Sequence, residues 1–226
     1  MRIAVFGTGM VGQALAARLA ELGHDVMVGT RDAAQALARK EPDSRGNPGF
    51  GAWHAGHPNV QVGTLRQAGA HGEILVNATS GEASLEVLRQ AGAERLPGKV
   101  LIDVANPLVF SKGMPPTLSV CNTDSLAEQI QRAFPALKVV KTLNTTNAAV
   151  MTNPAAVGDG NHTLFVCGND ADAKARVTEL VRSFGWRDVV DLGDITGARG
   201  AEMLLPIWLR LFGVLKTPLF NFKVVR

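Results

Sequence analysis

Short runs of apolar residues alternate along the chain with segments in which apolar residues recur at helical spacing. Such runs are typical of buried strands, and the spaced pattern is typical of helices that bury one face. We therefore expect repeated β-α-β units in one continuous doubly wound α/β domain over 1–226, with a mainly parallel sheet. The expected strands are 2–6, 25–29, 59–63, 73–79, 99–104, 137–143, 163–168 and 187–192. The expected helices are 13–22, 33–40, 64–70, 82–91, 123–134 with Thr123 as its cap, and 170–184.

Three stretches rich in glycine, proline or small polar residues interrupt this alternation and are predicted to be irregular, namely 41–58, 108–122 and 148–161. A loop as long as the first of these is usually functional or mobile. Trp53 in that loop can either cover a ligand or pin the loop to the surface, and the sequence does not choose between the two.

The segment 194–226 departs from the β-α-β pattern. A strongly apolar helix is expected over 200–216, kinked by Pro206 and followed by a short strand over 220–223. Such a helix can pack across the sheet edge, against a second copy of the chain, or along a ligand pocket. We favour packing, with a partial role for the helix and its Trp208 as a pocket wall.

A glycine-rich turn, Gly7-Thr8-Gly9-Met10-Val11-Gly12, lies directly between the first strand and the first helix. Gly7 permits the tight turn, Gly9 lets backbone amides approach a pyrophosphate, and Gly12 allows the helix to pack closely on the strand. The following helix N-terminus favours negative charge. This placement predicts a Rossmann-like dinucleotide-binding fold, although the same glycines can also form a tight turn without a ligand.

The end of the second strand favours NADP(H) over NAD(H). An NAD site usually has a carboxylate there, which bonds the ribose 2′-hydroxyl. Here Thr30 offers a hydroxyl and Arg31 a planar guanidinium suited to a phosphate, unless Arg31 is only a solvated surface residue. Asp32 is interpreted as a helix cap. Arg39 and Lys40 are interpreted chiefly as solvated residues at a helix end, although they could extend the positive field.

Polar turns follow three later strands, and in a parallel sheet all of them would face the cofactor crevice. Ala78-Thr79-Ser80 and Asn106-Pro107 are expected near the nicotinamide and its ribose. Ser80 or Thr79 could also cap the next helix, and Asn106 could simply form a turn. Asn144-Thr145 is expected where a second ligand would meet the nicotinamide.

Composition excludes several classes of protein. The formal charge of +3, without a basic run, does not favour nucleic-acid binding, and no apolar stretch is long enough to predict a membrane span. Cys121 and Cys167 are isolated and suggest reduced thiols in a cytoplasmic protein, and no metal-ligand spacing is present. The chain contains no tyrosine, so it lacks the Tyr-x-x-x-Lys proton donor of short-chain dehydrogenases.

The ordered motifs resemble the F420-dependent NADP reductase family, in which F420 is a deazaflavin coenzyme. The resemblance covers nearly the whole chain. Its pieces are the glycine turn, Val28-Gly29-Thr30-Arg31, Asn106-Pro107, Val139-Val140-Lys141-Thr142-Leu143-Asn144-Thr145, and Ala198-Arg199 with Glu202, the last two of which are expected to pair. The glycine turn is common to all Rossmann enzymes, but the ordered set without a long helical domain after it is more specific.

The resemblance implies hydride transfer between NADPH and the deazaflavin. Both partners store the hydride, so the protein needs positioning more than acid–base chemistry, and no catalytic side chain is expected. It also implies that Asn144 and Thr145 touch the deazaflavin or nicotinamide. The family often has further basic residues soon after the arginine of the second strand, where this chain has Ala33-Ala34-Gln35. The same motifs resemble the NADPH domain of ferric reductases, which pass electrons through a flavin.

Two other functions are compatible with the sequence. A reductase of a small carbonyl or imine substrate would need a proton donor, for which the loop histidines, Lys141 and Asp103 are the nearby candidates. A non-catalytic NADP sensor would bind a partner through the apolar C-terminal segment. That segment, over 200–222, is also the expected contact of a homodimer.

Overall fold

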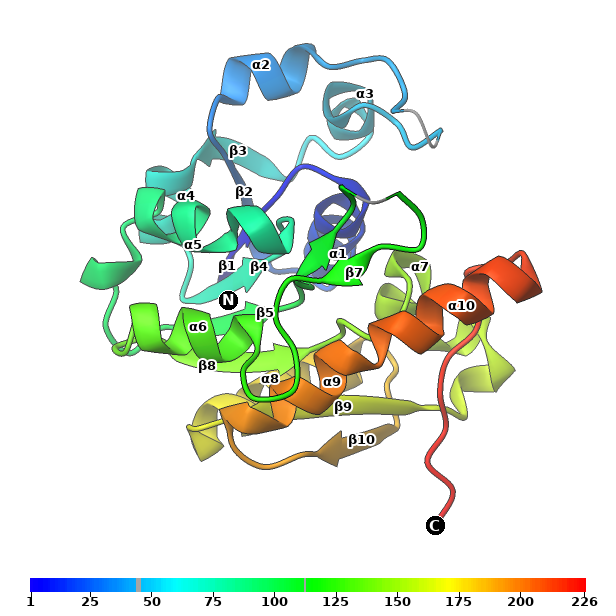
Figure 1. Ribbon diagram of the computed structural model, residues 1–226. Helices are drawn as coiled ribbons and strands as arrows, with labels where there is room; N and C mark the ends of the chain where they lie inside the picture. Colours follow the sequence, from blue (N-terminus) through cyan, green and yellow to red (C-terminus); the bar gives the residue numbers. More distant parts are fainter. Residues whose placement is uncertain (44–45, 112) are drawn as a thin grey trace.

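The centre of the molecule is an eight-stranded sheet in the order β10-β9-β8-β5-β4-β1-β2-β3 (Figure 1). The computed structural model describes residues 1–43, 46–111 and 113–226, so the parts of the expected irregular stretches at 44–45 and 112 lie outside the described residues. The strands of this sheet are β1 (Arg2–Phe6), β2 (Asp25–Thr30), β3 (Gln61–Thr64), β4 (Ile74–Asn77), β5 (Val100–Asp103), β8 (Lys138–Thr142), β9 (Thr163–Gly168) and β10 (Asp188–Asp191).

The sheet is mainly parallel, as the sequence predicts. The pairs from β3 through β2, β1, β4 and β5 to β8 are all parallel, which is the strand order of a dinucleotide-binding fold. The exception is β9, which pairs antiparallel with β8, while β10 runs parallel to β9. The chain therefore does not cross the sheet between β8 and β9 but turns back at the carboxyl edge.

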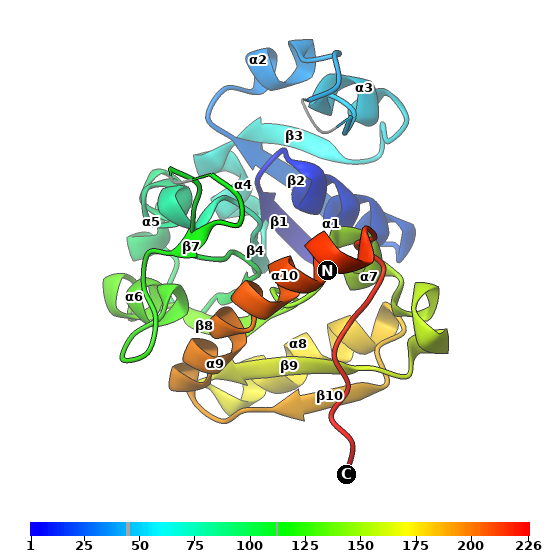
Figure 2. The same ribbon diagram turned by 45° about the vertical axis from the view of Figure 1, so that its right-hand side comes forward.

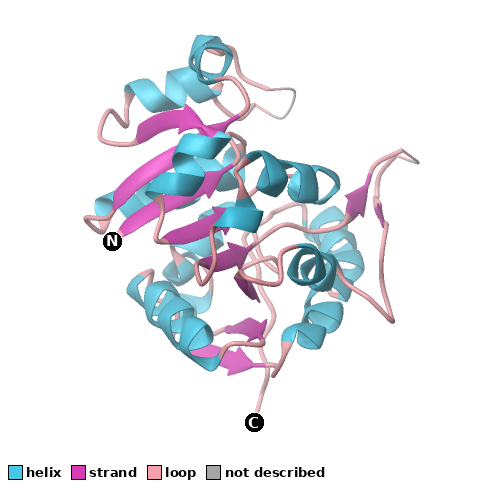
Figure 3. Ribbon diagram, turned by 90° about the vertical axis from the view of Figure 1, so that its left-hand side faces the viewer, coloured by secondary structure: helices cyan, strands magenta, loops and turns pink. Residues whose placement is uncertain are grey.

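Helices cover both faces of the sheet (Figures 2 and 3). The helices are α1 (Met10–Glu21), α2 (Ala33–Ala38), α3 (Phe50–Ala55), α4 (Leu65–His71), α5 (Gly81–Gln90), α6 (Leu126–Ala133), α7 (Ala148–Thr152), α8 (Ala171–Ser183), α9 (Ala198–Met203) and α10 (Leu205–Leu215). Alternate residues of β1 enter two separate cores: Ile3 and Val5 pack with α1 and α8, while Ala4 and Phe6 pack with α4, α5 and α6.

The stretches expected to be irregular contain short regular elements. The 41–58 stretch contains α3, in which Trp53 stacks on His57 with ring centroids 4.5 Å apart. The 148–161 stretch contains α7 and two 3-10 turns, Pro154–Ala156 and Gly158–Gly160. The 108–122 stretch contains a small hairpin of β6 (Leu108–Val109) and β7 (Thr117–Leu118).

The cap expected at Thr123 is wrong. Helix α6 begins at Leu126, and the hydroxyl of Ser125 accepts the hydrogen bond from the backbone N–H of Glu128. Ser125 therefore satisfies a free amide of the first helical turn, so Thr123 lies outside the helix.

The C-terminal segment forms two consecutive helices in place of one. Only Leu204 separates them, and its φ of −70° and ψ of −20° are helical, while Pro206 lies in the first turn of α10, where its missing N–H is tolerated. The strand expected over 220–223 is absent among the described residues. The tail makes one backbone bond to the sheet, from Thr163 N to Phe222 O, because β8 ends opposite Val166 and leaves this part of β9 uncovered.

Candidate functional site

Three glycines give the turn after β1 its shape. Gly7 has a φ of 125°, and a Cβ on it would lie 2.4 Å from the carbonyl oxygen of Ala78. A Cβ on Gly12 would lie 2.1 Å from the carbonyl oxygen of Gly7, so α1 packs closely against the turn. A Cβ on Gly9 would meet no protein atom within 4 Å. The turn is therefore tight at its first and third glycines and open to a ligand at the second.

This open turn forms part of a pocket of about 390 Å³ at the carboxyl edge of the sheet. The structure brings together in this pocket many of the residues that the sequence predicts for the cofactor. They are Gly7, Thr8, Gly9, Thr30, Arg31, Ala78, Thr79 and Ser80. Met10, 39% exposed, and Val11 begin α1 next to it. The far wall comes from α5, so a ligand would lie across β1, β2 and β4.

The tip of β2 presents no carboxylate to this pocket except Asp32. The side chain of Asp32 accepts a hydrogen bond of 2.9 Å from the backbone N–H of Gln35 and caps α2, as predicted. Thr30 is half-buried and Arg31 is exposed. A phosphate at this position would therefore meet a hydroxyl and a guanidinium, with the adjacent carboxylate already occupied.

The Thr79–Ser80 turn is held from beneath by buried Asn77. The hydroxyl of Thr79 donates to Asn77 Oδ1 at 2.7 Å, and Asn77 Nδ2 donates to Ser84 Oγ at 2.9 Å and Asp103 Oδ1 at 2.8 Å. Ser80 occupies the N-cap position of α5, but neither hydroxyl makes a capping bond. The alternative interpretation of this turn as a helix cap therefore holds for the position of Ser80 but not for a side-chain bond. The hydroxyl of Thr79 is turned toward Asn77, while Ser80 is exposed.

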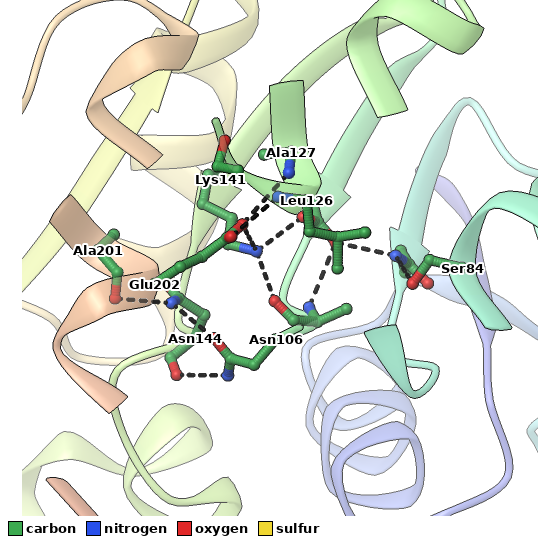
Figure 4. A network of polar contacts seen from close by, with 12 residues as sticks. Ser84, Asn106, Leu126, Ala127, Lys141, Asn144, Ala201 and Glu202 are labelled. Carbon is green, nitrogen blue, oxygen red and sulfur yellow. Dashed lines mark hydrogen bonds and ion pairs between the residues drawn. The ribbon is translucent and has the colours of Figure 1, made fainter. Parts of the chain in front are cut away.

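A buried ionic cluster connects this turn to the C-terminal helices (Figure 4). Lys141 Nζ lies 2.8 Å from Asp103 and 2.9 Å from Glu202, and it also donates to the carbonyl oxygen of Ala105. The side chains of Lys141 and Asp103 are fully buried. Burial alone would lower the pKa of Lys141, but the two carboxylates outweigh it and raise this pKa above its ordinary value of 10.5.

The predicted pair of Glu202 with Arg199 is wrong, because the two side chains extend from α9 toward different neighbours. Glu202 faces the sheet and accepts backbone hydrogen bonds from Leu126 at 2.9 Å and Ala127 at 3.2 Å, at the start of α6. Arg199 binds Glu128 at 2.6 Å and, mainly through its hydrogen bonds, lowers the pKa of that carboxyl. Together these contacts attach α9 to both β8 and α6.

Asn106 and Asn144 bind each other across the ends of β5 and β8 (Figure 4). Asn106 Nδ2 donates to the carbonyl oxygen of Asn144 at 2.9 Å, and Asn144 Nδ2 donates to Asn106 Oδ1 at 3.0 Å and to the carbonyl oxygen of Ala201 at 3.1 Å. Asn144 and Thr145 are each 2% exposed. Asn106 is less buried, and none of these three residues is among those that line the cofactor pocket.

The Asn106-Pro107 turn also packs against the start of α5. A Cβ on Gly81 would lie 2.2 Å from the carbonyl oxygen of Asn106. Trp208 lies apart from these turns, on α10. It is half-buried and stacks on Phe212 and Phe220 with centroid distances of 5.8 and 5.0 Å. The polar turns are thus one connected unit, and the structure places Trp208 in an aromatic cluster with the C-terminal tail.

Two features of the described residues concern other kinds of site. No cluster of three or more His, Cys, Asp or Glu side chains is arranged to hold a metal, and no helix is long and apolar enough to cross a bilayer, within residues 1–43, 46–111 and 113–226. Both cysteines are free, and burial raises the pKa of Cys167 to about 12. A thiol with this pKa is a poor nucleophile at neutral pH.

The strand order and the pocket define a Rossmann-type dinucleotide-binding protein. A sequence profile described as "NADP oxidoreductase coenzyme F420-dependent" matches residues 2–107. A protein of Arthrobacter sp. FB24, assigned provisionally as an F420-dependent NADP reductase, has a crystal structure that matches with a TM-score of 0.96 and 57% identity over 100% of both chains. The chain belongs to the family of coenzyme F420-dependent NADP oxidoreductases.

More distant relatives differ in how much of their own length this chain covers. The F420-dependent NADP reductase of Methanocaldococcus jannaschii is 28% identical over 93% of this chain and 92% of its own. Metalloreductase STEAP3 of Rattus norvegicus is 29% identical over 92% of this chain, which spans only 38% of that protein. The reductive aminase of Aspergillus terreus, solved with NADPH and ethyl levulinate, matches 95% of this chain and 62% of its own with a TM-score of 0.62 and 18% identity, and shares the fold alone.

Proposed function

We propose that the protein transfers a hydride between NADPH and a deazaflavin of the coenzyme F420 type, with a flavin as the second candidate acceptor. The observation that carries this proposal is the enclosure of Asp103, Lys141 and Glu202, the ionisable groups beneath the candidate nicotinamide turns. A carbonyl or imine reductase needs a proton donor that touches its substrate, whereas these groups bind each other, the backbone and the buried side chain of Asn77. Hydride transfer between two ring systems needs chiefly their alignment.

The proposed placement of NADPH follows the pocket. The pyrophosphate lies at Gly9 and the N-terminus of α1, and the 2′-phosphate lies at Thr30 and Arg31. The nicotinamide lies near Ser80, beside the Asn106-Pro107 turn, which packs against Gly81 and is not among the residues that line the pocket. The acceptor ring lies on the nicotinamide, above the Asn144-Thr145 turn. The assignment is supported by the relatives of similar length, two of which are F420-dependent NADP reductases.

Rapid oxidation of NADPH by coenzyme F420 is the expected result of mixing both with the purified protein. The measurement is stopped-flow absorbance of the nicotinamide band, with F420, FMN and FAD in separate reactions and a Gly9→Val variant as the control that cannot bind NADPH. We expect turnover of about 1–1,000 per second with the true acceptor. Binding of NADPH without oxidation by any of the three would contradict the proposal and favour a small-molecule reductase or a sensor.

A homodimer through α10 is the expected oligomeric state. The helix is almost wholly apolar, yet Leu205 is its one buried residue, and Ile207 and Val214 are 52% and 77% exposed. An exposed apolar surface of this kind marks an interface. We expect Ile207→Asp with Val214→Asp to convert a dimer to a monomer in light scattering after size exclusion. Val225→Asp in the exposed tail is the control, and a wild-type monomer would refute the interface.

A further inference from the structure

Two arginines flank α2 beside the cofactor pocket. Arg31 lies before the first turn of α2, Gln35 lies within the helix, and Arg39 is its C-cap residue with an extended backbone. All three line the pocket at the tip of β2. The helix of six residues between the arginines therefore presents a guanidinium at each end to the same space.

Arg39 is held against the glycine turn. Its Nη2 donates to Thr8 Oγ1 at 2.6 Å, so the guanidinium reaches from the end of α2 to the residue between Gly7 and Gly9. Arg39 also lines a second pocket, of about 460 Å³, which shares Thr8 and Gly9 with the first. It thus forms a shared wall of two pockets at the proposed phosphate position.

The backbone of Arg39 is fixed by close packing with α3. Its carbonyl oxygen accepts a hydrogen bond of 2.8 Å from Gly51 N, and a Cβ on Gly49 would lie 2.6 Å from the same oxygen. Gln13 Nε2 donates to the carbonyl oxygens of both Thr8 and Pro48, at 3.0 and 3.3 Å. The segment from Arg39 to Pro48 is therefore attached to the glycine turn and α1 through the Arg39–Thr8 and Gln13–Pro48 hydrogen bonds. These contacts fix the position of Arg39.

Within residues 1–43, 46–111 and 113–226, neither guanidinium forms an ion pair with a carboxylate. Within the described residues, the arginines that form ion pairs are Arg2, Arg18, Arg89, Arg132, Arg199 and Arg226. Asp32, the nearest acid in sequence to Arg31, caps α2. A guanidinium has five N–H donors, and only one bond of Arg39, to an uncharged hydroxyl, is made to a side chain.

We infer that Arg39 is a second phosphate-binding arginine, which binds the ribose 2′-phosphate of NADPH from the side opposite Arg31. The inference rests on the proposed placement of NADPH and deepens it, since it assigns coenzyme selectivity to a residue eight positions beyond Arg31. Thr8 positions the guanidinium before the coenzyme arrives. Arg39 thus supplies the second positive charge at a site where Ala33-Ala34-Gln35 supplies none.

The test compares Arg39→Gln, Arg31→Gln and the wild type by calorimetric titration with 2′,5′-ADP, 5′-AMP, NADPH and NADH. Each variant loses one charge-assisted contact to a phosphate, so its affinity for 2′,5′-ADP and NADPH is expected to fall by about 10- to 100-fold. The affinity for 5′-AMP and NADH is expected to stay within about twofold, because neither has the 2′-phosphate. Arg176→Gln, on α8, is the matched loss of charge and is expected to change none of the four affinities.

Two results would overturn the inference. If Arg39→Gln lowers the affinity for NADPH and NADH equally, Arg39 binds the pyrophosphate and not the 2′-phosphate. If the affinity for all four ligands is unchanged, Arg39 is a surface residue without a role in binding. Thr8→Val serves as a second variant that keeps both arginines. Its affinity for 2′,5′-ADP is expected to be about threefold lower, because it lacks the hydrogen bond that positions Arg39. These titrations contain no hydride acceptor, so they stand whether or not the protein reduces F420.

Discussion

Replacing Gly9 with valine is expected to abolish NADPH binding and to leave the fold intact. A side chain at this position would meet no protein atom within 4 Å of its Cβ, and the φ of −82° is one that valine adopts readily. The branched side chain would stand where the backbone amides must approach a pyrophosphate. We expect the dissociation constant of NADPH to rise by about 100-fold or more in a calorimetric titration. The melting temperature is expected to stay within about 2 °C of the wild type.

Gly12→Val is the matched comparison at the third glycine. Its Cβ would lie 2.1 Å from the carbonyl oxygen of Gly7, so the helix would have to move and the protein is expected to lose about 1–3 kcal/mol or more of stability. The two variants separate binding from folding within one motif. Tight NADPH binding by a folded Gly9→Val variant would show that the pyrophosphate lies elsewhere.

Replacing Lys141 with methionine is expected to destabilise the protein by about 3–5 kcal/mol. Methionine fills a similar volume, but it leaves the buried carboxylates of Asp103 and Glu202 without their cation. An uncompensated buried charge is much more costly than a lost contact between neutral groups. The measurement is urea denaturation, in which the midpoint should fall while the slope stays constant if only stability has changed.

The triple variant Lys141→Met, Asp103→Asn, Glu202→Gln distinguishes charge from packing. The amide oxygen at position 103 can still accept from Asn77, and the single amide oxygen at position 202 can still accept from Leu126, so only the bond from Ala127 N–H to the other oxygen of Glu202 is lost. We therefore expect this variant to recover most of the stability that the single variant loses. Equal destabilisation of the two would contradict the electrostatic explanation and point to a packing defect.

The same cluster predicts a loss of stability in alkaline solution. The folded protein raises the pKa of Lys141 above its unfolded value of 10.5, so the charged lysine stabilises the folded state fully below pH 10.5. This contribution is lost as the pH rises from that value through the raised folded pKa. Stability of the wild type should consequently fall more steeply across this range than that of the triple variant, as urea midpoints at successive pH values would show.

Local patterns in the sequence predict the elements that depend on neighbouring residues. The glycine turn, the cap at Asp32 and most strands follow from patterns within a few positions, and the structure has them. The short helix α3 was missed because its region is rich in glycine. Gly51 is there for close approach to α2, where a Cβ would lie 1.9 Å from Leu37 O.

The sequence does not predict contacts between side chains that are far apart along the chain. Lys141 and Glu202 both belong to motifs that resemble the family, yet nothing in either motif indicates that the two side chains meet. The expected pair of Glu202 with Arg199 fits helical spacing. Glu202 instead binds buried groups, which are Lys141 on β8 and the backbone N–H of Leu126 at the start of α6. Likewise, Arg39 looks like a solvated helix end until the turn at Thr8 is folded beside it.

The buried cluster has a consequence for how the sequence can diverge. Asp103, Lys141 and Glu202 come from β5, β8 and α9, but no one of them can change alone without leaving a buried group unpaired. Their inheritance is therefore coupled: descendants should keep all three or replace them together by a neutral set. An alignment of relatives should show covariation among these positions, while surface residues of the same elements drift independently.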